Sequence, residues 1–172
     1  MSQMVLSELT NYLERIEDLR HQIVELISDL PLQALNWRPI EGKDEHITNS
    51  LAVLASHVSG AEHFWIAEVI GNRKATRDRN AEFSAIAINS ESILNEIKKT
   101  AEETREVFSK LDDKDLNGTR QVKERIIPVR WCILHVVDHT ALHLGHMQIT
   151  YQLWSGGKSF ESPLWFERLP KN

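Results

Sequence analysis

Cysteine is the scarcest chemistry-bearing residue of this chain: the 172 residues include one, Cys132. A single cysteine cannot form a disulfide within the chain, which excludes the small secreted domains that depend on a disulfide framework. It fits a reducing compartment, and we expect a cytoplasmic protein. We interpret Cys132 as a small buried residue rather than as a nucleophile.

Long apolar runs and basic clusters are also missing. No stretch approaches the roughly 18 consecutive apolar residues that read as a membrane-spanning helix. The first residues reach Glu8 and Glu14 without the basic and apolar segments of a secretory signal. The formal net charge is −5, and acidic and basic residues are interleaved, so there is no basic patch for nucleic acid. We therefore expect neither a membrane nor a nucleic acid as a partner.

Helical periodicity is the main pattern that the chain does have. Apolar residues from Leu6 to Leu30 recur at alternating spacings of three and four, which predicts an amphipathic helix interrupted by Arg20. Comparable patterns, flanked by good capping and stop residues, continue along the chain. Together they predict four helices, over residues 4–29, 48–71, 89–111 and 129–154.

Four helices of similar length predict an all-α fold, with a four-helix bundle as the simplest architecture for one domain over residues 1–172. The connections after the first two helices are longer than an antiparallel helix pair needs, so one of them is expected to cross the length of the bundle. Residues 119–130 are either a short strand or an extended segment. We expect the short C-terminal tail around Trp165 to dock on the domain or to reach a partner chain.

Histidines are concentrated in the last predicted helix, where residues 135–146 hold four of the chain's eight. Each helical residue advances by about 100°, so the four fall within an arc of roughly 80°. They are His135, His139, His143 and His146. Burying several imidazoles costs free energy unless they have partners, and a divalent metal ion is a partner for neutral imidazoles one turn apart. We favour a metal site over a mixture of surface and packed histidines.

A metal ion needs a further ligand from elsewhere in the chain. The best candidate is His57, which lies in a predicted helix beside small residues such as Ser59 and Gly60 that leave room for close approach. His63 is about 600° further around that helix and is expected to face away. The remaining two histidines, expected at the surface, are His21 and His46.

Other histidine chemistries are less well supported. HTALH, residues 139–143, has the outer spacing of HExxH but places Thr140 where a protease needs its general-base glutamate. HVVDH, residues 135–139, resembles the inverted arrangement with the shorter Asp138 in the glutamate position. No GxGxxG, P-loop or GxSxG segment is present. A zinc protease is therefore disfavoured, and haem bound by the histidines remains an alternative.

Three segments of the chain, in order, resemble the DinB/YfiT-like family of metal-dependent enzymes. LNWRPIEGK, residues 35–43, is similar to the loop after the family's first helix. SLAVLASHVSGAEHFW, residues 50–65, is similar to its second helix, and RWCILHVVDHTALHLGHMQITYQLW, residues 130–154, is similar to its fourth. The last segment contains the pattern HxxxHxG, about eighty residues after the histidine of the second helix.

The resemblance implies an up-down-down-up four-helix bundle, usually a homodimer, with a divalent metal ion bound by three histidines. Carried over to this sequence, the ligands are His57, His139 and His143. Where the family often has glutamine, this chain has His146. Three roles are open for it: a fourth ligand, a hydrogen-bond donor beside the ligands, or an imidazole that faces the pocket. We expect His135 beside the ligands rather than among them.

The resemblance also implies an activity, because characterised members of the family include transferases that use thiols such as bacillithiol or mycothiol, and a thiol-dependent isomerase. Three imidazoles leave a metal ion with an open position, where a bound water or thiol loses its proton readily. We therefore expect a metal-dependent thiol S-transferase acting on a small electrophile, with His146 or Asp138 as proton acceptor. The alternative is a non-catalytic, stress-associated metal-binding protein. Zinc or nickel is expected, with iron or copper as alternatives.

Overall fold

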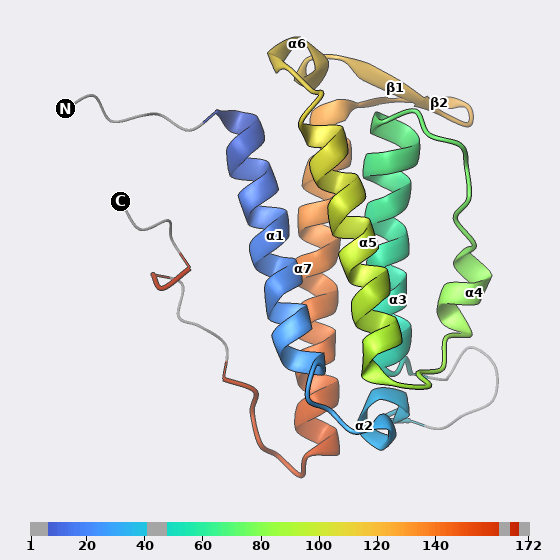
Figure 1. Cartoon of the computed structure of the whole chain (residues 1–172), viewed down its shortest axis with the longest axis vertical. Coiled ribbons are helices and arrows are strands. Elements are labelled where there is room, and N and C mark those ends of the chain that lie inside the picture. The colour runs from blue at the N-terminus through green and yellow to red at the C-terminus, as the bar shows by residue number, and fades with distance from the viewer. Residues whose placement is uncertain (1–6, 41–47, 162–165, 169–172) are drawn as a thin grey trace.

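The computed structural model describes residues 7–40, 48–161 and 166–168, most of which are helical (Figure 1). The long helical segments are α1 (Glu8–Ile27), α3 (Leu51–Glu62) with its π-helical continuation η2 (His63–Ile70), α5 (Ser90–Phe108) and α7 (Val129–Trp154). The short helices are α2 (Leu32–Asn36), α4 (Arg79–Phe83) and α6 (Asp113–Leu116). The strands β1 (Thr119–Val122) and β2 (Arg125–Pro128) pair as an antiparallel hairpin before α7.

Side-chain caps start several of these helices where the sequence predicts. The hydroxyl of Ser50 accepts a hydrogen bond from the backbone N–H of Val53 at the start of α3, and the side chain of Asn89 caps α5 in the same way. Gly71 ends η2, its N–H donating to the carbonyl of Ile66. Residues 4–6 of the first predicted helix lie outside the described residues, as do His46 and Trp165.

The connections contain more structure than their polar sequences predict. Residues 31–40 include α2, and the polar segment after Gly71 includes α4, which Asp78 caps by accepting hydrogen bonds from two backbone N–H groups. The ambiguous residues 119–130 form the hairpin and the start of α7. These helices have four or five residues, too few for a periodic pattern to show.

The long helices lie side by side, with α2 near one end and the hairpin and α6 at the other (Figure 1). Helix α1 packs on α7 and α5, and α3 packs on α5, α7 and α4. The buried apolar residues form two clusters. One includes Leu51 and Met147 near α2, and the other includes Ile66 and Ile133 near the hairpin. Within the described residues, no helix is both long enough and apolar enough to span a membrane.

A buried ion pair explains the arginine that interrupts the apolar pattern of α1. Nη2 of Arg20 donates to Oε1 of Glu62 at 2.5 Å, and the hydroxyl of Thr104 donates to the same oxygen. Arg20 is 7% exposed and Glu62 3% exposed. The three residues join α1, α3 and α5 through one closed hydrogen-bond group.

Cys132 is fully buried and free, in agreement with its interpretation as a small core residue. Burial raises the pKa of its thiol to about 11, so the thiolate is scarce at neutral pH. This environment does not suit a nucleophile.

Candidate metal centre

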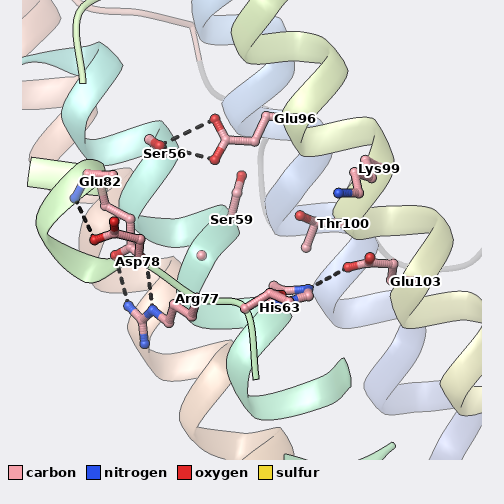
Figure 2. Close-up of a pocket in the computed structure, with 13 residues that line it drawn as sticks. Ser56, Ser59, His63, Arg77, Asp78, Glu82, Glu96, Lys99, Thr100 and Glu103 are labelled. Atoms are coloured by element: carbon pink, nitrogen blue, oxygen red, sulfur yellow. Dashed lines mark hydrogen bonds and ion pairs between the residues drawn. The ribbon is translucent and has the colours of Figure 1, made fainter. Parts of the chain in front are cut away.

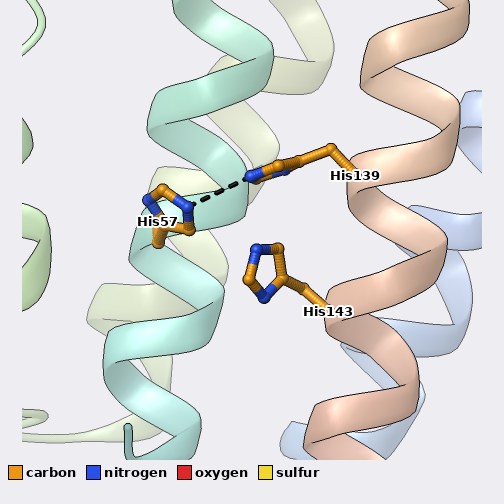
Figure 3. Close-up of side chains that lie close together, drawn as sticks. All are labelled: His57, His139 and His143. Atoms are coloured by element: carbon orange, nitrogen blue, oxygen red, sulfur yellow. Dashed lines mark hydrogen bonds between the residues drawn. The ribbon is translucent and has the colours of Figure 1, made fainter.

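Three histidines from two helices converge between α3 and α7 (Figure 3). His57 comes from α3, and His139 and His143 lie one turn apart on α7. One ring nitrogen from each lies within 4.8 Å of those of the other two. Among the described residues, they form the one group of three histidine, cysteine or acidic side chains that could hold a metal ion.

The spacing of these nitrogens fits a shared ion. The Nε2 atoms of His57 and His139 are 3.1 Å apart. Two ligands that each lie 2.0–2.1 Å from a tetrahedral zinc ion are about 3.3 Å apart. The ring centroids of His139 and His143 are 4.4 Å apart, and that of His143 lies 5.0 Å from that of His57. The donor set is therefore suited to one divalent ion.

Glu82 of α4 fixes the orientation of the His57 ring. Its Oε2 lies 2.9 Å from Nδ1 of His57, and Arg77 donates to both carboxylate oxygens, at 2.6 and 2.9 Å. A carboxylate accepts, so Nδ1 carries the proton, and Nε2 is left with its lone pair directed at His139. Burial works to raise the pKa of Glu82, but the hydrogen bonds from Arg77 and His57 outweigh it, so the pKa is lowered and Glu82 is ionised.

Gly60 makes room for this carboxylate. A Cβ atom added at Gly60 would lie 2.1 Å from Oε1 of Glu82. The sequence predicts that small residues beside His57 permit close approach, and the structure shows that at Gly60 the approaching group is Glu82. Sequence reasoning missed Glu82 because it lies in a segment that was interpreted as a polar connection. The one signal for a helix there is Asp78, a good capping residue four positions before Glu82.

His139 and His143 are neutral at physiological pH. Burial, together with the neighbouring imidazoles, lowers the pKa of His139 to about 3 and that of His143 to about 4. Unprotonated rings keep the lone pairs that a metal ion needs. The protein therefore presents its ligands without first having to release protons from these two rings.

The other residues of the histidine-rich stretch lie at different distances from the three rings. Nδ1 of His146 is 3.4 Å from Nδ1 of His143, and His146 is exposed. His135 stacks on Trp131 with ring centroids 4.9 Å apart and lies beside the group, its centroid 5.6 Å from that of His139. Asp138 is exposed, and the structure does not bring it to the three rings.

His63 and His21 lie outside the group. The ring of His63 lies 2.6 Å from Glu103 and 2.9 Å from the hydroxyl of Thr76. His21 is an exposed residue of α1, 3.2 Å from Glu25. Both positions agree with the sequence prediction.

Solved structures share this fold. The chain matches a crystal structure of a conserved protein from Enterococcus faecalis with a TM-score of 0.70 and 12% identity, over 88% of this chain and 99% of that one. It matches a DinB-like protein from Bacillus cereus ATCC 10987 with a TM-score of 0.69 and 15% identity, over 90% of this chain and 97% of that one. A comparison with curated proteins finds no match.

The sequence itself matches the family model of the DinB superfamily over residues 15–147. The matched region contains all three converging histidines, Glu82 and His146. The match covers more than half of the chain, and the structural neighbours agree with it. This chain belongs to the DinB superfamily.

Proposed function

We propose that the chain is a metal-dependent enzyme that binds one divalent metal ion through His57, His139 and His143. The observation that carries the proposal is the convergence of three imidazole nitrogens within 4.8 Å, one of them oriented by a buried carboxylate. Carboxylate–histidine pairs of this kind hold metal-bound imidazoles in place. Zinc or nickel suits this all-nitrogen set, with iron and copper as alternatives.

The proposed reaction is the transfer of a low-molecular-weight thiol to a small electrophile. When bound, a metal ion with three protein ligands lowers the pKa of a water or thiol in its open position. Of the two proposed proton acceptors, His146 is better placed than Asp138, because its Nδ1 lies 3.4 Å from that of His143. Its exposure allows it to pass a proton to solvent.

An apolar groove next to His146 supports a small organic substrate. The groove has a volume of about 430 Å³ and is lined by His146 together with Ile40, Leu54, Ile149 and Leu153. Three of these apolar residues are more than half exposed. A small molecule bound here would lie against the imidazole that adjoins His143.

We further propose that the four long helices form an up-down-down-up bundle within one domain over residues 1–172. In support, the segment between η2 and α5, which carries α4, passes along the outside of α3 (Figure 1). A connection of this kind lets α5 begin at the end where α3 begins. A cytoplasmic location is part of the proposal and is supported by the single, free cysteine.

A homodimer is also proposed, with α7 as its contact helix. Three large apolar residues of α7 outside the groove are 43–58% exposed: Trp131, Leu134 and Leu142. They recur at helical spacing along the helix. A second copy would bury this surface. Sedimentation should give a dimer at micromolar concentration, and Leu142→Glu should shift it to monomer.

Metal analysis of the purified protein tests the central proposal. We expect one divalent ion per chain, lost in His139→Ala and retained in the control His21→Ala. Full occupancy in His139→Ala would contradict the ligand assignment. Thiol consumption with a panel of electrophiles then tests the activity. Absence of any metal-dependent turnover would favour the non-catalytic, stress-associated metal-binding protein.

A further inference from the structure

A polar cavity of about 330 Å³ lies between α3 and α5 (Figure 2). Its walls come from α3, the start of η2, α5, α4 and the segment that leads into α4. Ser59 and Gly60 line it from α3, at positions turned by about 60–160° from His57 around the helix axis. Thr100 and Glu96 line it from α5. The cavity is therefore separate from the ring nitrogens that face α7.

Two largely buried residues of the cavity wall have hydroxyl groups that form no hydrogen bond within the described part of the chain, but the oxygen atoms themselves are not sealed from water. Ser59 is 4% exposed and Thr100 6% exposed. Figure 2 shows both hydroxyl oxygens directed into the space between α3 and α5. Water in the cavity reaches both oxygens, so a ligand that displaces this water has to supply hydrogen bonds of its own. The two hydroxyls are placed to make such bonds with a polar occupant.

Most of the charged groups around the cavity are already paired. Glu82 is held by Arg77 and His57, and Glu103 lies 2.6 Å from the ring of His63. Asp78 accepts hydrogen bonds from backbone N–H groups of α4. These contacts satisfy the acids at one end of the cavity.

Glu96, an exposed residue of α5, forms no ion pair with the described residues. Within the described residues, its carboxylate accepts from the hydroxyl of Ser56 alone, at 3.1 and 3.3 Å (Figure 2). Desolvation raises the pKa of Glu96 and the negative charge of Glu82 adds to this effect, while the hydrogen bond from Ser56 and the positive charge of Lys99 lower it. Lys99 lines the cavity at its exposed edge and forms no ion pair with the described residues. Three positions apart on α5, Glu96 and Lys99 thus place a carboxylate and an ammonium group at the open side of the cavity.

We propose that this cavity binds the primary ammonium group of a small polar molecule. An ammonium group has three N–H donors. The carboxylate of Glu96 and the hydroxyls of Ser59 and Thr100 supply three acceptors. Lys99 would meet a carboxylate on the same ligand, so the class includes amino acids as well as simple amines. The site requires no metal ion, although Glu82, which orients His57, also lines the cavity.

Calorimetric titration of the full chain with ethanolamine tests the site. We expect saturable binding of one ethanolamine per chain, weakened at least about tenfold by Glu96→Gln, since this change removes a charged hydrogen-bond acceptor. Thr100→Val should weaken it by about two- to tenfold. Glu102→Gln makes the same charge change at an exposed position of α5 and should leave the affinity unchanged.

Two further ligands define the chemistry of the site. Sodium acetate should not bind. L-serine should bind more tightly than ethanolamine, and Lys99→Met should remove that advantage without changing ethanolamine binding; equal affinities of the two would limit the class to simple amines. The proposal is overturned if ethanolamine fails to saturate at about 10 mM, if acetate binds equally well, or if Glu96→Gln and Glu102→Gln have the same effect.

Two controls separate this site from folding and from the metal centre. Thr100→Val keeps the shape of the side chain and removes a hydroxyl that has no partner, so the ligand-free Tm should not fall. His139→Ala should leave ethanolamine binding intact while it removes the metal ion. A loss of ethanolamine binding in His139→Ala would contradict the independence of the two sites.

Discussion

Two groups of polar side chains in the interior of this protein are centred on Glu62 and His57, only five residues apart on α3. They differ in whether the protein itself supplies all of their hydrogen-bond partners. Around Glu62, every partner is supplied by the protein: Arg20 and Thr104 donate to its carboxylate. Around His57, the protein leaves acceptors without a shared partner. Nδ1–H of His57 donates to Glu82, and one ring nitrogen of each of His57, His139 and His143 faces a common centre.

The difference separates a structural polar group from a binding site. The ion pair is closed by hydrogen bonds within the chain, so nothing further is needed to keep it buried. His139 and His143 have lowered pKa values and remain neutral, and converging imidazole lone pairs are stabilised by a cation. Burial of polar side chains alone would not distinguish the two groups, whereas the direction of their hydrogen bonds does.

The largest expected effect on stability comes from breaking the hydrogen-bond group of Arg20, Glu62 and Thr104. Glu62→Leu leaves the guanidinium of Arg20 buried without its carboxylate, which should lower the free energy of unfolding by about 3–5 kcal/mol. The double variant Arg20→Met/Glu62→Leu should recover most of this loss. Urea denaturation measures both values. Zinc binding should be unchanged in the double variant, and a double variant as unstable as the single one would contradict the assignment.

Substitution within the group of His57, His139 and His143 should leave the stability of the metal-free protein unchanged. His139→Leu removes a desolvated imidazole, so the metal-free protein should keep its stability. Zinc at 100 times its Kd should stabilise the unmodified chain by about 2.7 kcal/mol and the variant not at all. Thermal unfolding with and without zinc measures this. A large loss of stability in the metal-free variant would place the histidines with the structural group.

The contact between Glu82 and His57 can be disturbed without touching a histidine. Gly60→Ala places a methyl group where Oε1 of Glu82 lies, so the carboxylate must move. Loss of such an orienting partner should weaken metal binding by about 10–100-fold, with little change in stability. Gly145→Ala is the matched control, because a Cβ there meets no atom within 4 Å. Equal zinc affinities of the two variants would argue against the role of Glu82.

A smaller effect is expected on the pH dependence of stability. The folded pKa values of His139 and His143, about 3 and about 4, lie below the ordinary histidine value of 6.5. Between these values the unfolded chain binds protons that the folded chain does not, so the metal-free protein should lose stability as the pH falls from 6.5 towards 4. Urea denaturation at several pH values, with a chelator present, should show a shallower loss in His139→Ala than in His21→Ala. Equal slopes would contradict the lowered pKa values.

The helices and the three histidines could be predicted because each has a strong local pattern. Apolar spacing and caps such as Ser50 and Asn89 indicate the long helices, and the one-turn spacing of His139 and His143 indicates a shared face. Small residues beside His57 indicated it as the further ligand, and the family resemblance supplied the complete set of three, because contacts between distant segments leave no periodic trace.

The supporting residues could not be predicted for a related reason. Glu82 lies on a helix of five residues, and its role depends on the space left by Gly60, twenty-two positions earlier. The π-helical segment His63–Ile70 departs from the 3.6-residue period on which angular arguments rest. Arg20 reads as an interruption of an apolar face until its partner Glu62 is known.

A crystal structure of the zinc-loaded protein, with anomalous scattering measured at the zinc edge, tests the central claim most directly. We predict one strong anomalous peak per chain, within bonding distance of a ring nitrogen of His57, His139 and His143. Soaked protein that shows no peak there, or a peak held by other side chains, would contradict the claim that these three rings form a metal site.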